Sequence, residues 1–133
     1  MKPNSVFVIT GGASGIGLCT GRKVVAAGHR VAVCDYNMDA ARAACEELGD
    51  NAKAFELDVR DIAAWGRVLD QLWAEYGAID VFMNGAGVIY TKYINDMTDD
   101  EIRHLVDVNF LGLVNGCRAV SYTHLRAHET VLD

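Results

Sequence analysis

The sequence predicts an α/β fold in which one domain is built on a parallel sheet. Short apolar runs rich in valine and isoleucine alternate along the 133 residues with longer segments of helical periodicity. Glycines stand at many of the junctions between them. Because strands that alternate with helices are joined by crossover connections, the neighbouring strands are expected to be parallel. No internal repeat or linker divides the chain, which indicates one domain or part of one.

The expected strands are short, apolar and rich in β-branched residues. The first (SVFVIT) and the fourth (IDVFM) both run into glycines, and the third is the weakest of the set. The four strands are expected at residues 5–10, 30–35, 52–57 and 79–83.

The expected helices follow the strands and have recognisable start and stop signals. Thr98 and Glu101 have the spacing of a capping box and open the last helix. The clearest helix carries one apolar stripe at three- and four-residue steps, made of Ile62, Trp65, Val68, Leu69, Leu72, Trp73 and Tyr76. The four helices are expected at residues 15–27, 38–48, 61–76 and 98–119.

Charge and composition exclude several classes of partner. The formal net charge is −6, and the acidic residues are scattered along the chain. A nucleic-acid groove or an anionic membrane surface needs a basic patch, so neither partner is expected. The sequence shows no secretory signal, and no apolar stretch is long enough to cross a bilayer. The protein is therefore expected to be cytoplasmic.

The cysteines fit the same expectation. Their spacing matches neither a CxxC pair nor a zinc ligand set, so they are interpreted as reduced core thiols of a cytosolic protein. They are Cys19, Cys34, Cys45 and Cys117.

The glycine turn, residues 10–17 (TGGASGIG), joins the first strand to the first helix and is expected to bind the pyrophosphate of a dinucleotide. N–H groups at a helix N-terminus are unpaired, and the helix dipole favours an anion there. Gly11 permits the tight turn, Gly15 lets the backbone approach the pyrophosphate, and Gly17 lets the helix pack against the strand. Ile16 belongs to the same predicted site. A glycine triplet alone also occurs in simple tight turns.

Asp35, at the end of the second strand and 18 residues after Gly17, strengthens that interpretation. A carboxylate at this place can accept hydrogen bonds from both hydroxyls of the adenosine ribose, and it would repel a 2′-phosphate. Ser14 is neutral, so no cation is provided there for such a phosphate. Both features favour NAD over NADP. The alternative interpretation of Asp35 is a solvated carboxylate in a loop.

The glycine spacing GxxxGxG, with Thr10 before it, resembles that of the short-chain dehydrogenase/reductase family. Three later segments resemble motifs of that family in the same order, so that the resemblance covers residues 5–119: Asp58-Val59, Asn84-Gly85-Ala86-Gly87, and Asn109 within VNFLG. The resemblance implies a Rossmann-type doubly wound parallel sheet with strand order 3-2-1-4-5-6-7. Strands 3-2-1-4 are expected in this chain, and strands 5-6-7 are expected to be absent.

The resemblance also implies site residues. Asp58 is expected to meet the adenine ring, and the cofactor site is expected to include Val59, Asn84, Ala86 and Gly87. Gly85 replaces the asparagine usual in the family, which removes a side chain that helps to hold the central sheet.

Asn109 is the candidate catalytic residue. It lies seven residues after Ile102, on a stripe with Leu105, Val106 and Leu113. Asparagine is a poor helix former, and its burial without partners costs free energy, so it is expected to have a hydrogen-bonding task. The resemblance implies a local kink that frees a backbone carbonyl for a water in a proton relay. The alternative is a satisfied asparagine at a contact between helix and sheet.

The family's serine, tyrosine and lysine are absent from the chain, since none of its five tyrosines is followed four residues later by lysine. The expected parent protein is an oxidoreductase, homo-oligomeric in solution, that transfers a hydride between NAD and a small alcohol or ketone. This chain is expected to be its cofactor-binding half and to be inactive alone. One alternative is a dinucleotide-binding sensor without turnover; a sugar-nucleotide epimerase is disfavoured because its group has TGxxGxxG.

Residues 120–130 (VSYTHLRAHET) break the apolar pattern of the last helix. The same eleven residues translate one frame of a transposon-type sequencing adapter. Residues 1–119 are therefore interpreted as the dinucleotide-binding part of one domain, and residues 120–133 as a non-native tail. His124 and His128 are spaced like two metal ligands on a helix, but no third ligand accompanies them, and no metal site is expected.

Overall fold

A four-stranded parallel sheet forms the centre of the computed structural model, which describes residues 1–132 and the side chains of residues 1–123. The strands lie in the order β3-β2-β1-β4, as the sequence predicts. Each strand is in parallel register with its neighbour, and Thr10 at the end of β1 is paired with Cys34 and with Asn84. The strands are β1 (Val6–Thr10), β2 (Arg30–Asp35), β3 (Ala52–Glu56) and β4 (Val81–Asn84).

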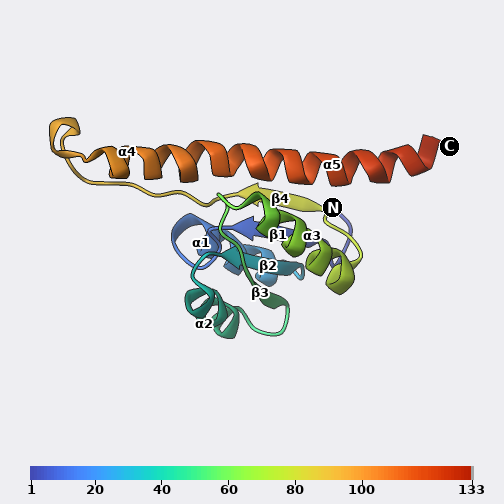
Figure 1. Cartoon of the computed structure of the whole chain (residues 1–133). Coiled ribbons are helices and arrows are strands. Elements are labelled where there is room, and N and C mark those ends of the chain that lie inside the picture. Colours follow the sequence, from blue (N-terminus) through green and yellow to red (C-terminus); the bar gives the residue numbers. More distant parts are fainter. Residues whose placement is uncertain (133) are drawn as a thin grey trace.

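Helices cover both faces of this sheet, which makes the fold a doubly wound, Rossmann-like one (Figure 1). Side chains of β1 and β2 alternate between the two faces, because successive residues of a strand point in opposite directions. Val31 and Val33 pack with α1 and α2, whereas Ala32 and Cys34 pack with α3. The helices are α1 (Gly15–Ala26), α2 (Met38–Leu48), α3 (Ile62–Tyr76), the 3₁₀ turn η1 (Ile94–Asp96), α4 (Asp99–Val106), the π-helical η2 (Asp107–Gly112) and α5 (Leu113–Leu132).

Three helices start at polar caps, and the sequence predicts one of them, the capping box of Thr98 and Glu101. Asn37 and Asp61 each accept a hydrogen bond from the backbone N–H three residues later, at the start of α2 and of α3. Thr98 and Glu101 form the capping box of α4. These bonds satisfy N–H groups that a helix leaves unpaired.

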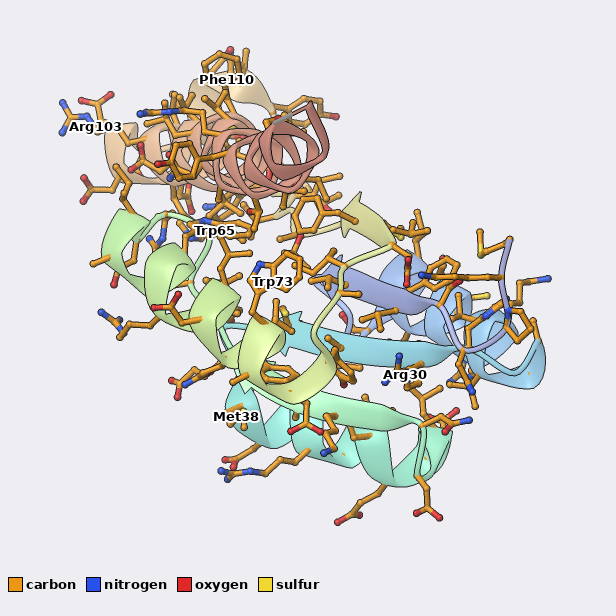
Figure 2. The ribbon with its side chains drawn as sticks, turned by 90° about the vertical axis from the view of Figure 1, so that its right-hand side faces the viewer. Arg30, Met38, Trp65, Trp73, Arg103 and Phe110 are labelled. Carbon is orange, nitrogen blue, oxygen red and sulfur yellow. The ribbon has the colours of Figure 1, made fainter. Side chains whose placement is uncertain are left out.

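The last part of the chain differs from the expected single helix over residues 98–119. It consists of α4, η2 and α5, which form one continuous rod beside β4 and α3 (Figure 1). The helix continues to Leu132 instead of ending near residue 119 as expected, and Val120 is buried. Phe110 and Arg103 project from the rod away from the sheet, while Trp65 lies between α3 and the rod (Figure 2).

Two expectations about buried side chains are wrong. Ile62 is 69% exposed, because it begins α3 and lines a groove beside α5 instead of packing on the sheet. Cys19 and Cys117 are exposed, whereas Cys34 is buried and Cys45 half-buried; all four are free thiols. Cys19 lies opposite the face of α1 that carries Gly17, Gly21 and Val24 into the core.

Among residues 1–132, no helix is both long enough and apolar enough to span a membrane.

Candidate functional site: a cleft at the carboxyl ends of the strands

The glycine turn has the tight geometry that its sequence predicts. Gly11 and Gly15 have φ angles of +66° and +52°, which side-chain-bearing residues rarely adopt. A Cβ on Gly17 would lie 2.3 Å from the carbonyl oxygen of Gly11, so the first turn of α1 packs directly against the chain leaving β1. Nothing lies within 4 Å of a Cβ on Gly15, which leaves open space at the helix N-terminus. The backbone of the turn therefore borders an open volume.

That volume is a cleft of about 580 Å³ over the carboxyl ends of the strands. Apart from Asn84, all the cofactor residues that the sequence predicts line it. Crevices at this edge of parallel sheets are common ligand sites. The cleft is lined by Gly11, Ser14, Gly15, Ile16, Gly17, Asp35, Tyr36, Leu57, Asp58, Val59, Arg60, Gly85, Ala86, Gly87, Val88, Ile89, His104 and Val108.

Asp35 connects the end of β2 to the glycine turn. Its Oδ2 accepts a hydrogen bond from the backbone N–H of Ala13 at 3.3 Å, and its Oδ1 accepts one from Asn37 at 3.1 Å. The residue is half-buried at the wall of the cleft. Two backbone N–H groups therefore hold the Asp35 carboxylate beside the helix N-terminus.

Thr10 has a structural role that the sequence reasoning missed. Its buried hydroxyl accepts hydrogen bonds from the backbone N–H groups of Gly85 at 3.1 Å and Ala86 at 3.3 Å. A Cβ on Gly85 would lie 2.6 Å from the carbonyl oxygen of Thr10, so this close approach requires glycine. The hydroxyl and the glycine together hold the segment after β4 against the end of β1. The combination of a threonine ending β1 with a glycine after β4 is the signal that could have indicated this contact.

Asp58 and Arg60 form the most strongly interacting charged pair of the cleft. The guanidinium donates from Nε to Oδ1 at 3.0 Å and from Nη2 to Oδ2 at 2.7 Å. Hydrogen bonding to Arg60 is the main cause that holds the pKa of Asp58 below its usual value, and partial burial opposes it. Arg60 is the only lysine or arginine that lines the cleft in the described part of the chain.

Sequence reasoning also missed Tyr36, Arg60 and His104. Arg60 follows Asp58 by two residues, a spacing at which an aspartate commonly accepts the backbone N–H. His104 precedes Val108 by four residues, which places both on one face of the rod. The imidazole Nδ1 of His104 lies 2.8 Å from the hydroxyl of Tyr90, and this bond fastens the segment after β4 to α4.

Asn84 lies outside the cleft. Its Nδ2 donates to the carbonyl oxygen of Leu113 at 3.3 Å and to Sγ of Cys117 at 3.4 Å. Gly116 makes room for it, since a Cβ there would lie 2.5 Å from Oδ1 of Asn84. The side chain therefore joins β4 to α5 in this structure.

Asn109 is exposed, so the expectation of a buried side chain is wrong, but it has the expected hydrogen-bonding task. Its Oδ1 accepts from the backbone N–H of Val88 at 2.7 Å, and its Nδ2 donates to the carbonyl oxygen of Val88 at 2.8 Å. It lies within η2, so the helix is locally distorted there, as the resemblance implies. The apolar stripe predicted burial wrongly, because the rod leaves Val106 and Leu113 exposed as well.

Replacing Asn109 by alanine is expected to loosen the segment after β4, because both hydrogen bonds to Val88 are lost. Hydrogen exchange of the Val88 amide should become about tenfold faster, corresponding to roughly 1.4 kcal/mol for a local opening. Asn115→Ala is the matched control, since Asn115 donates to the carbonyl oxygen of Val59 and not to this segment. Equal exchange of Val88 in the two variants would contradict the assignment.

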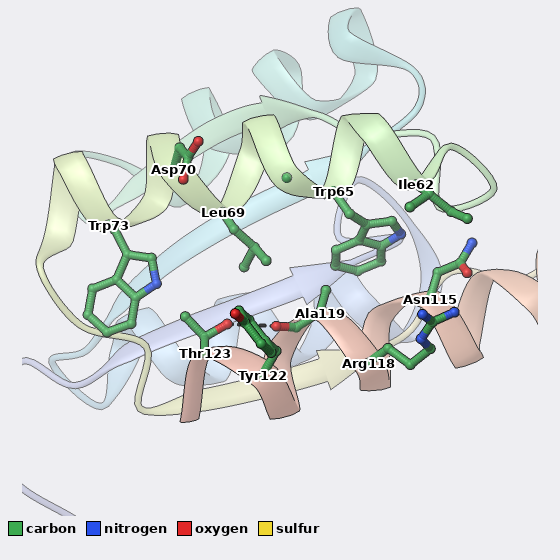
Figure 3. A pocket seen from close by; sticks show the side chains of 11 residues that line it. Ile62, Trp65, Leu69, Asp70, Trp73, Asn115, Arg118, Ala119, Tyr122 and Thr123 are labelled. Carbon is green, nitrogen blue, oxygen red and sulfur yellow. Dashed lines mark hydrogen bonds between the residues drawn. The ribbon is translucent and has the colours of Figure 1, made fainter. Parts of the chain in front are cut away.

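A second hollow, the α3–α5 groove, lies apart from the cleft and has a volume of about 540 Å³ (Figure 3). Its wall is mostly aromatic and aliphatic, with Trp65 and Trp73 on α3 facing Ala119 and Tyr122 on α5. No group of three metal-ligating side chains occurs among those described through residue 123. The sequence expectation about His124 and His128 falls on side chains outside the described ones.

Comparison with known proteins identifies the family. The profile of the family described as short chain dehydrogenase matches residues 5–130. Among curated relatives, the 2,3-dihydro-2,3-dihydroxybenzoate dehydrogenase of Bacillus subtilis is 36% identical over 119 residues, which cover 87% of this chain and 46% of that protein. Galactitol 2-dehydrogenase of Agrobacterium fabrum is 34% identical, with 89% of this chain and 46% of the relative covered. The chain thus spans about half the length of these relatives.

Solved structures give the same answer. Serine dehydrogenase from Escherichia coli superimposes with a TM-score of 0.80 at 32% identity, covering 86% of this chain and 54% of the other. The 3-ketoacyl-(acyl-carrier-protein) reductase from Brucella melitensis, in complex with NADH, gives a TM-score of 0.79 at 25% identity, with 87% and 48% covered. The matching fold, glycine turn and sequence together show that this chain belongs to the short-chain dehydrogenase family of oxidoreductases.

Proposed function

We propose that the chain binds NAD(H) in the cleft and is the cofactor-binding half of a dehydrogenase that acts on a small alcohol or ketone. The observation that carries this proposal is the placement of the half-buried Asp35 carboxylate beside the open N-terminus of α1. The reductase complexed with NADH and the relatives named galactitol 2-dehydrogenase and sorbitol dehydrogenase support the cofactor and substrate classes. When bound, NAD(H) supplies a hydride acceptor or donor.

The residues present fit the pyrophosphate of such a cofactor. The first turn of α1 contains no acidic residue, and the hydroxyl of its N-cap Ser14 makes no capping bond. The unpaired N–H groups of that turn and the positive end of the helix dipole favour an anion in the open space beside Gly15. Ser14 and Ile16 would bound the phosphate site, and Gly17 keeps the helix close to the strand.

The adenosine end would be held between Asp35 and Asp58. Asp35 accepts the ribose hydroxyls and disfavours a 2′-phosphate, which supports NAD over NADP. Val59, Ala86 and Gly87 would form the rest of this wall. Asn84 acts from outside the cleft by joining β4 to α5.

The catalytic part of the proposal concerns the whole protein. Asn109 would contribute through a backbone carbonyl freed in η2, while its side chain fixes Val88. A serine, and a tyrosine paired with a lysine, would have to be supplied by sequence that is not in this chain. The chain alone is therefore expected to bind the cofactor without turnover, and the complete enzyme is proposed to be a homo-oligomer.

Calorimetric titration of the 133-residue chain with NADH and with NADPH tests the cofactor proposal. Binding of NADH at least about tenfold tighter than NADPH is expected, because only NADPH brings a phosphate dianion to Asp35. Incubation with NAD and galactitol should produce no NADH. If the folded chain, checked by circular dichroism, binds neither cofactor, the proposal is wrong; tighter binding of NADPH would refute the choice of NAD.

A cofactor sensor without turnover is the second candidate, favoured by the absence of a Tyr-x-x-x-Lys pair from the chain. The natural reading frame downstream of codon 119 distinguishes the two functions. We propose that residues 120–133 are not native, because residues 120–130 translate one frame of a sequencing adapter. Resequencing the source gene across this junction should recover a different continuation. A serine followed by Tyr-x-x-x-Lys supports the enzyme, and its absence supports the sensor.

A further inference from the structure

The carboxylate of Asp58 already accepts three hydrogen bonds, so it can accept few others. An ionised carboxylate has about four lone-pair positions. Oδ1 accepts from both the backbone N–H and Nε of Arg60, each at 3.0 Å, and Oδ2 accepts from Nη2 at 2.7 Å. One acceptor position, on Oδ2, therefore remains. Asp58 lines the cleft and its side chain is 39% exposed, so this position is accessible to a ligand.

Arg60 itself is held from several directions. Its strongest partner is Asp58, and Asp107 of η2 and Tyr36 after β2 interact with it electrostatically. The planar guanidinium makes two parallel bonds to the carboxylate, which fix its orientation as a single point charge would not. The carboxylate of Asp58 is thus both oriented and kept ionised by one side chain.

We propose that Arg60 is a positioning residue for base recognition: it holds Asp58 so that the single free acceptor position of the carboxylate selects a purine with a 6-amino group over one with a 6-oxo group. The inference rests on the proposed function, since it assumes that the adenosine end of NAD(H) occupies this part of the cleft. An ionised carboxylate can only accept hydrogen bonds. It therefore matches the N–H of adenine and opposes the carbonyl oxygen of hypoxanthine.

The selectivity must depend on pH. Protonation converts Asp58 into a donor, which can bond to a 6-oxo group, so the preference for adenine is lost as the pH falls through the pKa of Asp58. Arg60 lowers that pKa, which extends the adenine-selective range to more acidic pH. The other charged or titratable groups near the pair line the cleft, act on the pair electrostatically, or line with Asp58 a hollow between β3 and α3. They are Asp35, Tyr36, His104, Asp107, Glu56, Asp61, Arg67 and Glu75.

The test compares NADH with reduced nicotinamide hypoxanthine dinucleotide, which differs from NADH at the 6-position of the base. The ratio of the two affinities is measured by calorimetry between neutral and acidic pH. Asp35 would face the ribose, which is the same in both ligands, so its contribution cancels in this ratio. Repeating the profile with His104→Gln removes any contribution from that imidazole.

The unsubstituted chain should prefer NADH by about tenfold at neutral pH. Asp58→Asn should abolish or reverse the preference, because a carboxamide can donate to the 6-oxo group. Arg60→Gln should weaken NADH binding at neutral pH and move the loss of preference to higher pH. Arg60→Lys should restore the pH profile through its charge, but not the full affinity, since it lacks the planar fork.

Arg67→Gln is the matched control, because Arg67 bridges Asp61 with 3.8 Å between Nη2 and Oδ2 and lies outside the cleft. Two results would overturn the inference even if the chain binds NADH. One is an affinity ratio and pH profile that do not change in Arg60→Gln, and the other is an equal change in Arg67→Gln. If the unsubstituted chain does not bind NADH at all, the proposed function fails and the inference fails with it.

Discussion

Replacing Gly17 by alanine is expected to abolish measurable NADH binding and to destabilise the fold. The added Cβ would lie 2.3 Å from the carbonyl oxygen of Gly11 and 3.0 Å from Cα of Gly12. Because both neighbours are backbone atoms, the glycine turn must shift to relieve the overlap, and the helix N-terminus moves with it. Overpacking of this kind costs about 1–3 kcal/mol of unfolding free energy. The affinity for NADH should fall by roughly a hundredfold, the equivalent of about 2.7 kcal/mol.

Gly66→Ala is the matched control for Gly17→Ala. Gly66 lies inside α3, and no atom lies within 4 Å of a Cβ at that position. Alanine there should raise the free energy of unfolding by about 0.5–1 kcal/mol, because glycine loses more conformational entropy in a helix. Urea denaturation measures the stability of both variants, and calorimetry measures NADH binding. A Gly17→Ala variant that binds NADH like the unsubstituted chain would show that the glycine turn does not hold the cofactor.

Replacing Asp35 by asparagine should weaken NADH binding and strengthen NADPH binding. The carboxamide retains the shape of the side chain but loses the charge that accepts the ribose hydroxyls and repels a 2′-phosphate. Each affinity should change by about tenfold, so that the ratio between the cofactors changes by about a hundredfold. The free energy of unfolding should also fall, because either the backbone N–H of Ala13 or that of Asn37 loses its acceptor.

Asp80→Asn separates this effect from a general loss of negative charge. Asp80 accepts from the backbone N–H of Val6 at 2.8 Å and pairs with Lys2, at the end of the sheet opposite the cleft. Its substitution should lower stability without changing the cofactor ratio. A ratio that is unchanged in Asp35→Asn, or that changes as much in Asp80→Asn, would contradict the role of Asp35.

Local patterns in the sequence determined the order of the elements and most of their boundaries. β2 and α2 begin and end at the predicted residues, because β-branched runs and helix caps act within a few positions of the chain. The glycine turn was also predictable, since its φ angles and close approaches are requirements of a short segment. Together with Asp35 and Asp58, that segment indicated the cleft.

The sequence could not show which polar side chains point into the cleft, because their partners are distant along the chain. Asn84 bonds to Leu113 and Cys117, and Asn109 bonds to Val88. The apolar periodicity around Asn109 predicted burial, but periodicity does not report whether another element covers the stripe.

By itself, then, the sequence determined a parallel sheet with a glycine turn and an acidic residue at the next strand end. Only the tertiary structure decided that Asn109 bonds to Val88 and that Thr10 joins the ends of β1 and β4. The physical reason is that strand and helix formation follow from short-range steric preferences and apolar spacing. A hydrogen bond between side chains and distant backbone depends on how whole elements pack.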